Sequence, residues 1–217
     1  MSLSRETEVI FDSRRGQDYH SANPPLYDSS TFHQTVLGGN AQYDYARSGN
    51  PNRTLLEEKL ARLEGGKYAF AYASGIAAIT AVLLTLKSDD HVILPDDIYG
   101  GTLRLTEQIL NRFNIKFTTV NATNILEIKN AIQSNTKLIY VETPSNPLFK
   151  ITDIRALARI AKQNNLLLAV DNTFMTPLGQ SPLALGADIV VHSATKFLGG
   201  HSDLIAGAAI TNRKDIA

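Results

Sequence analysis

Three groups of residues in this 217-residue sequence have types and positions that suit one kind of chemistry. Lys196 lies in a loop rich in serine and threonine, where a lysine amine can form an imine with an aldehyde. Asp171 ends an apolar run, and a carboxylate in that position suits a buried cation. Ser74-Gly75-Ile76 places small residues at the expected start of a helix, where free backbone amides can bind a phosphate.

One cofactor, pyridoxal 5′-phosphate, would use all three groups together. Its phosphate needs amide and hydroxyl donors, its ring nitrogen needs a nearby anion to stay protonated, and its aldehyde needs a lysine. Each group alone has an ordinary alternative. Lys196 could be a surface charge, Asp171 a helix cap, and Ser74-Gly75 a strand-to-helix turn. Their combination predicts a pyridoxal phosphate site.

The scaffold for these residues is predicted to be an α/β sheet. From Lys67 onward, short β-branched or aromatic runs alternate with segments of helical period. We expect a mostly parallel seven-stranded sheet between helices. The expected strands are Ala69–Ala73, His91–Leu94, Ile115–Val120, Lys137–Val141, Leu166–Val170, Asp188–Val191 and Leu204–Thr211. Ligands bind such sheets at the carboxyl ends of the strands, so the polar loops after them should meet at one edge.

Start and stop signals place the helices and divide the chain. Asn124 and Asp153 can each cap a helix, and Asn50-Pro51 begins another that ends at Gly65-Gly66. The apolar stripe of this last helix is Leu56, Leu60 and Leu63. Proline and glycine break any long period in the first fifty residues, which predicts an extended N-terminal arm. We therefore expect an arm and first helix over residues 1–60 and a cofactor-binding α/β domain over residues 61–217.

Composition excludes several classes of function. The 21 basic and 21 acidic residues give no net charge, so neither nucleic acid nor an anionic membrane is an expected partner. The absence of cysteine excludes disulfide scaffolds, iron–sulfur clusters and thiol nucleophiles. The five histidines lack the spacing of a metal site, and no metal is expected. No apolar stretch is long enough to span a bilayer and no signal peptide precedes it, which fits a cytoplasmic location.

Six sequence blocks also resemble the cystathionine synthase and lyase family of pyridoxal-phosphate-dependent enzymes. They are residues 43–51, 73–75, 97–102, 142–147, 170–174 and 192–203. The resemblance covers essentially the whole chain, but family members are nearly twice as long. It implies the large domain of a fold type I transferase, incomplete at its C-terminal end, with the C-terminal domain absent. No residue of this chain can be nominated to bind the substrate carboxylate, a task that the absent domain performs in the family.

The resemblance implies a role for each matching residue. Lys196 would bond to the cofactor aldehyde and later move the substrate Cα proton, and Asp171 would pair with the ring nitrogen. Tyr99 would stack on the ring, although ordinary packing remains an alternative. The residues implied to bind the phosphate are Gly75, Ile76, Ser193 and Thr195, and Asn146 is implied to lie near the ring hydroxyl.

Two residues of the arm are implied to act in a neighbouring subunit. Tyr45 and Arg47 match family positions that reach the partner's phosphate, which implies a dimer that shares its sites and a tetramer for the longer protein. Arg47 could instead pair with Asp44 at the surface.

The implied reaction is the cleavage of cystathionine by β-elimination to homocysteine, pyruvate and ammonia. γ-Lyase, γ-synthase and O-acetylhomoserine sulfhydrylase reactions use the same core and stay open. A second alternative is a non-catalytic fragment that needs a separate C-terminal half.

Overall fold

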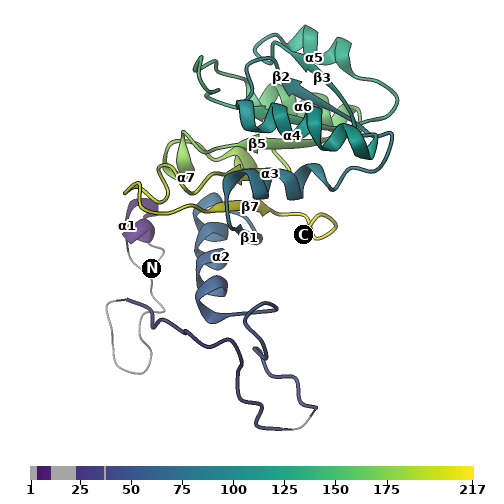
Figure 1. The fold of residues 1–217 in the computed structure, drawn as a ribbon. Helices are drawn as coiled ribbons and strands as arrows, with labels where there is room; N and C mark the ends of the chain where they lie inside the picture. The colour runs from purple at the N-terminus through teal and green to yellow at the C-terminus, as the bar shows by residue number, and fades with distance from the viewer. Residues whose placement is uncertain (1–3, 11–22, 37) are drawn as a thin grey trace.

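The computed structural model describes residues 4–10, 23–36 and 38–217, and its centre is a seven-stranded sheet (Figure 1). The strands are β1 Tyr68–Tyr72, β2 His91–Pro95, β3 Lys116–Val120, β4 Thr136–Glu142, β5 Leu167–Asp171, β6 Ile189–His192 and β7 Gly207–Thr211. Their order across the sheet is β1-β7-β6-β5-β4-β2-β3. Strands β2 to β6 are parallel, and β7 runs antiparallel to both β1 and β6. The predicted mostly parallel α/β sheet is confirmed.

Helices lie in the segments that join the strands, and they cover both faces of the sheet (Figure 1). They are α1 Arg5–Ile10, α2 Pro51–Glu64, α3 Gly75–Leu83, α4 Gly100–Gln108, α5 Ile125–Ala131, α6 Ile154–Gln163, α7 Thr176–Gly179 and α8 Pro182–Leu185, with a 3₁₀ turn at Leu110–Phe113. One apolar core joins α3 to the sheet, and a second joins α5 and α6 to it. Neighbouring residues of one strand serve different cores, as Leu138 and Ile139 do, because successive side chains point to opposite faces.

The predicted helix caps are confirmed. Asn124 Oδ1 accepts the Leu126 amide at 3.1 Å and starts α5, and Asp153 Oδ1 accepts the Ala156 amide at 3.0 Å and starts α6. Each cap satisfies an amide that has no partner inside its helix.

Helix α2 begins and ends where the sequence predicts. The Asn50 side chain accepts the Asn52 amide at 2.8 Å, and Gly65 ends the helix in the left-handed region with φ 71°. The predicted stripe is only partly correct, because Leu60 and Leu63 are buried whereas Leu56 is 46% exposed. The helix runs across the expected boundary between residues 60 and 61, so that division stays a prediction.

The N-terminal arm is extended over most of its described length and runs away from the sheet (Figure 1). Its first described segment corrects the prediction, because residues 5–10 form the short helix α1. The Arg5 guanidinium donates to the backbone oxygen of Pro177 at 3.0 Å and to the Ser181 hydroxyl. These contacts with residues more than 170 positions away explain why local sequence signals missed this helix.

The last strand also differs from the prediction, which started it at Leu204. Strand β7 begins at Gly207, because the backbone of Ala206 bonds to the amide and the hydroxyl of Thr195 instead of to a neighbouring strand. The Ala206 amide donates to Thr195 Oγ1 at 3.1 Å, and Thr195 Oγ1 donates to the Ala206 oxygen at 3.2 Å. Among the described helices, none combines the length and hydropathy needed to cross a bilayer.

Candidate active site

A cavity of about 280 Å³ opens at the carboxyl ends of β4, β5 and β6, beside the start of α3. Eight of the ten predicted site residues line it: Gly75, Ile76, Tyr99, Asn146, Asp171, Ser193, Thr195 and Lys196. They come from segments spread over more than 120 positions of the sequence. The sheet brings them together because the parallel strands end at the same edge.

Asp171 is the last residue of β5 and is held at both carboxylate oxygens. Its Oδ1 accepts the Thr173 amide at 2.9 Å, and its Oδ2 accepts the hydroxyl of the buried Tyr140 at 3.1 Å. The turn contact matches the helix-cap alternative, yet the side chain also lines the cavity. Asp171 therefore presents a fixed carboxylate to whatever binds there.

Lys196 lies in the loop that follows β6. Its amide donates to the Ser193 oxygen at 3.1 Å, and its own oxygen accepts the Gly200 amide at 2.8 Å, so the loop folds into tight turns. The side chain is exposed and lines the same cavity as Asp171. The two groups that the chemistry requires thus face one space.

The start of α3 also lines the cavity, next to the loop that contains Lys196. Ser74 caps the helix by accepting the Ala77 amide at 3.2 Å, and the amides of Gly75 and Ile76 have no acceptor within the helix. A Cβ on residue 75 would lie 2.5 Å from the Ser193 Cβ, so only glycine fits between the helix and the lysine loop. Free amides and a serine hydroxyl meet here, which is a donor set that suits a phosphate.

The Thr195 hydroxyl, which is predicted to bind the phosphate, already makes a hydrogen bond within the chain. This hydroxyl has one proton, which it donates to the Ala206 oxygen at 3.2 Å. Donation to a phosphate would require this bond to be exchanged.

Glu142 is a cavity residue that sequence reasoning did not nominate. It ends β4 as Asp171 ends β5, and its carboxylate accepts the Tyr99 amide at 3.1 Å from each oxygen. Burial, together with the negative charge of Asp171, raises the pKa of Glu142 to about 8. The signal that could have found it is the one used for Asp171, a carboxylate that closes a buried strand.

Tyr45 and Arg47 are the two predicted residues that do not line the cavity. They lie on the arm, where the Arg47 guanidinium sits 4.9 Å from the centre of the Tyr45 ring. The Asp44 carboxylate accepts the Tyr45 amide at 2.6 Å. Their implied contact with a neighbouring subunit stays a prediction.

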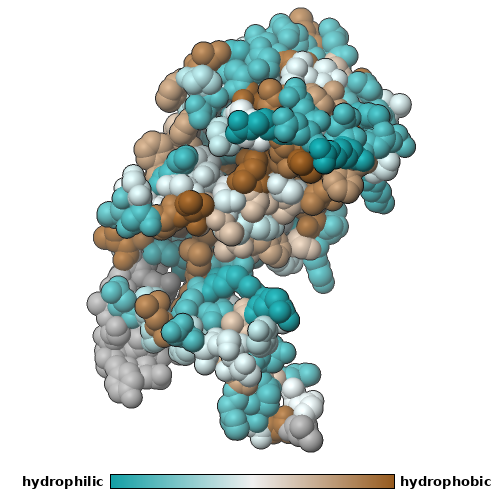
Figure 2. All heavy atoms as spheres, viewed as in Figure 1, coloured by the Kyte–Doolittle hydropathy of each residue, from teal (hydrophilic) through white to brown (hydrophobic). Residues whose placement is uncertain are grey.

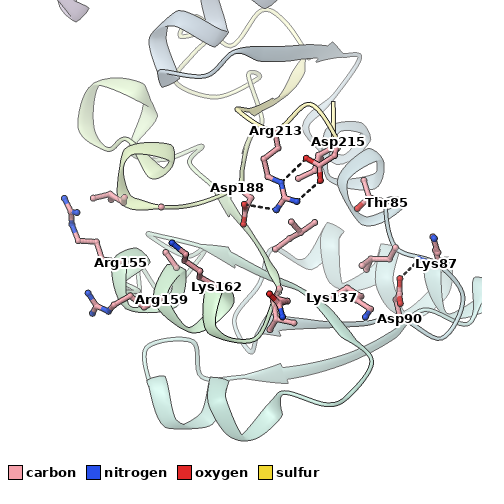
Figure 3. A pocket seen from close by; sticks show the side chains of 18 residues that line it. Thr85, Lys87, Asp90, Lys137, Arg155, Arg159, Lys162, Asp188, Arg213 and Asp215 are labelled. Atoms are coloured by element: carbon pink, nitrogen blue, oxygen red, sulfur yellow. Dashed lines mark hydrogen bonds and ion pairs between the residues drawn. The ribbon is translucent and has the colours of Figure 1, made fainter.

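Two other cavities help to define the site. One of about 650 Å³ shares Phe174, Thr195, Lys196 and Ile205 with the first and extends it on the side of the lysine loop. A larger one of about 1050 Å³ lies at the amino ends of the strands (Figure 3). It contains Arg155, Arg159 and Lys162 of α6 but none of the ten predicted residues. The cavity of about 280 Å³, which eight of the ten predicted residues line, is therefore the candidate active site.

Comparison with known proteins identifies the family of the chain. Residues 6–217 match the family described as Cys/Met metabolism PLP-dependent enzyme, which is nearly the whole chain. The chain belongs to this family. The sequence is 85% identical over all 217 residues to cystathionine β-lyase MetC of Staphylococcus haemolyticus, of which it covers 56%. It is 48% identical over 215 residues to cystathionine γ-lyase of Bacillus subtilis, of which it covers 57%.

A solved structure has the same fold. The crystal structure of metB from Corynebacterium glutamicum superposes with a TM-score of 0.95 at 43% identity, over 99% of this chain and 57% of that one. The chain thus spans about half the length of the relatives it matches.

The cavity residues fit pyridoxal phosphate, the cofactor of the family, in three respects. Free helix amides beside Ser193 supply phosphate donors, and a Cβ at position 75 would fill the space between them. Asp171 and Lys196 line the cavity, where the carboxylate is of the type that a protonated ring nitrogen requires and the amine is of the type that an aldehyde requires.

Proposed function

We propose that this protein is a carbon–sulfur lyase that cleaves cystathionine to homocysteine, pyruvate and ammonia with the aid of pyridoxal phosphate. The 85% identity to a cystathionine β-lyase over all 217 residues carries this proposal. The placement of Lys196 and Asp171 in one cavity supports it independently.

Pyridoxal phosphate, when bound, supplies an aldehyde for a lysine amine and a protonated ring that withdraws electrons from the substrate. Lys196 would supply that amine and would also act as the base that removes the proton from the substrate Cα. Asp171 is proposed to hold its negative charge beside the ring nitrogen. The overall reaction would break the Cβ–S bond of cystathionine, release homocysteine as its thiolate and, with one water molecule, yield pyruvate and ammonia.

The remaining cavity residues are proposed to hold the cofactor. The amides of Gly75 and Ile76 and the Ser193 hydroxyl would bind the phosphate, with Thr195 joining after it gives up its bond to Ala206. Tyr99 would cover the ring and Asn146 would lie near its hydroxyl. Glu142, which accepts the Tyr99 amide, would fix the start of α4 and so the base of the Tyr99 side chain.

We further propose that the protein is a homo-oligomer located in the cytoplasm. Tyr45 and Arg47 would reach the phosphate of a neighbouring copy, since they lie outside the cavity of their own chain. Apolar surface supports association: Phe197 is 63% exposed and Leu178 51% exposed. Figure 2 shows further apolar patches, in brown, on the face in view.

The decisive experiment is a product assay with cystathionine. Pyruvate with homocysteine supports the β-lyase, whereas 2-oxobutyrate with cysteine rejects it in favour of the γ-lyase that the B. subtilis relative represents. Assays with activated homoserine esters and a thiol donor test the γ-synthase and sulfhydrylase alternatives. The assay on the 217 residues alone, and again with the second half of a relative added, tests whether these residues suffice.

A further inference from the structure

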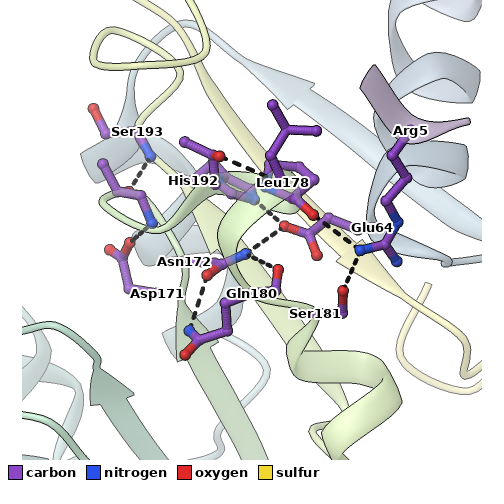
Figure 4. Close-up of polar contacts among 12 residues, drawn as sticks. Arg5, Glu64, Asp171, Asn172, Leu178, Gln180, Ser181, His192 and Ser193 are labelled. Carbon is purple, nitrogen blue, oxygen red and sulfur yellow. Dashed lines mark hydrogen bonds and ion pairs between the residues drawn. The ribbon is translucent and has the colours of Figure 1, made fainter. Parts of the chain in front are cut away.

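A buried carboxylate and imidazole pair lies behind the candidate active site. Glu64 is the last residue of α2 and His192 the last residue of β6, and both side chains are fully buried. Glu64 Oε1 lies 2.5 Å from His192 Nε2 (Figure 4). Neither residue lines the cavity, and no role proposed above uses them.

Two amide side chains extend this pair across the sheet. Asn172 Nδ2 donates to the same Glu64 oxygen at 2.8 Å and to the Gln180 backbone oxygen at 3.1 Å. Gln180 Nε2 donates to Asn172 Oδ1 at 3.0 Å and to the Thr143 backbone oxygen at 3.1 Å. The network of Glu64, His192, Asn172 and Gln180 therefore connects the ends of β4, β5 and β6.

Each strand end in this network is adjacent in sequence to a residue of the cavity. Asn172 follows Asp171, and His192 precedes Ser193, which begins the loop that contains Lys196. Successive residues of an extended chain point to opposite sides. The network thus holds the same backbone from the side opposite to the cavity, and it joins the two segments that bear Asp171 and Lys196.

The cost of the network argues that it does more than stabilise the fold. Glu64 Oε2 and His192 Nδ1 are buried and have no hydrogen-bond partner among the residues described. Burial of polar groups costs free energy that apolar side chains of similar volume do not cost, and each unsatisfied polar atom adds a further penalty. Apolar residues would fill this space at lower cost, but they would leave the strand ends free to shift relative to one another.

We propose that Glu64 and His192 are positioning residues, which fix the end of β5 and the lysine loop so that the Asp171 carboxylate and the Lys196 amine keep the separation that the cofactor requires. The inference rests on the proposed function, because it assigns these residues to the same site.

The test compares variants at this pair with a matched histidine elsewhere. His91 is also buried, and it bonds to the hydroxyls of Thr136 and Thr118 at 2.8 and 2.9 Å, but it lies at the amino end of β2, at the opposite edge of the sheet. The variants are the double replacement Glu64→Leu with His192→Leu, the single His192→Gln, and the control His91→Leu. The double variant removes both polar groups, so no unpaired charge stays buried.

Four measurements are made on the protein loaded with pyridoxal phosphate: melting temperature, cofactor dissociation constant, circular dichroism of the bound cofactor, and kcat with KM. For the double variant we expect a melting temperature close to wild type, weaker cofactor dichroism, about tenfold weaker cofactor binding and a kcat about 10²-fold lower. KM should change little. His192→Gln, whose amide can still donate to Glu64, should restore most of the dichroism. His91→Leu should lower the melting temperature. It should leave the cofactor dissociation constant, the dichroism and kcat near their wild-type values.

Native dichroism, cofactor affinity and kcat in the double variant would overturn the proposal, as would equal cofactor defects in His91→Leu. If the double variant does not fold, His192→Gln decides: a partial loss of dichroism and kcat at an unchanged melting temperature supports positioning, and wild-type dichroism and kcat contradict it. A wild-type protein that binds no cofactor would instead refute the proposed function.

Discussion

Glu142 and Asp171 stand directly opposite each other as the last residues of the neighbouring parallel strands β4 and β5. Two carboxylates at one register position, both lining the same cavity, repel each other when both are ionised. Asp171 accepts hydrogen bonds at both oxygens, while Glu142 is the more strongly buried of the two. Burial and the neighbouring Asp171 carboxylate raise the pKa of Glu142 to about 8, so Glu142 is protonated below that pH.

This pair predicts a pH-dependent stability. The pKa of Glu142 rises from 4.5 to about 8 on folding, so the folded protein binds a proton that the unfolded chain releases between these values. The free energy of unfolding should therefore fall as pH rises through this interval. Glu142→Gln, which stays neutral, should flatten the decline in melting temperature of the cofactor-free protein between pH 5.5 and 8.5, by roughly a few degrees. The exposed Glu107→Gln serves as control, and an equal slope in both variants would contradict the assignment.

The charge of Asp171 is predicted to matter more than its hydrogen bonds. Asp171→Asn keeps an oxygen that can accept the Thr173 amide but removes the anion beside the proposed ring nitrogen. We expect the cofactor absorption band to persist and kcat for cystathionine cleavage to fall by about 10² to 10³. A kcat within about threefold of wild type would show that the carboxylate charge does not support catalysis.

Gly75 is predicted to be essential for the contact between α3 and the lysine loop. A Cβ there would lie 2.5 Å from the Ser193 Cβ, so Gly75→Ala should cost about 1–3 kcal/mol of stability and weaken cofactor binding. Gly100 is the matched control, because it also begins a helix and a Cβ there meets nothing within 4 Å. Gly100→Ala should change stability by less than about 0.5 kcal/mol. Urea unfolding and cofactor titration of both variants check this, and equal losses would argue against the close approach.

The proposed sharing of sites between subunits predicts complementation. Arg47→Ala and Lys196→Ala should each be inactive as pure proteins. In a mixed dimer one site combines the intact Lys196 of one protomer with the intact Arg47 of the other, so random mixing should restore about a quarter of the sites. Activity is measured after the two variants are unfolded and refolded together. No recovery, despite mixed dimers shown by differently tagged chains, would place Arg47 outside the site.

Much of this architecture was predictable from local sequence. Runs of apolar residues and the caps Asn124 and Asp153 identify strands and helices because these signals act over a few neighbouring residues. The gathering of Asp171 and Lys196 was predictable from topology, since parallel strands expose their carboxyl ends at one edge.

Other features depend on contacts between distant residues. Helix α1 is positioned by Arg5 through contacts with Pro177 and Ser181, and the start of β7 is set by Thr195. Local periodicity predicts neither the helix nor the start of the strand, because the hydrogen bonds that fix them come from residues in distant parts of the chain.

The amino-acid sequence by itself determined the family, the sheet and the chemical groups of the candidate site, because these follow from residue type and short-range order. Tertiary structure alone decided that Glu142 opposes Asp171 and that Glu64 meets His192. Strand register and helix packing create these pairs, and their protonation and positioning effects arise only when the partners are buried side by side.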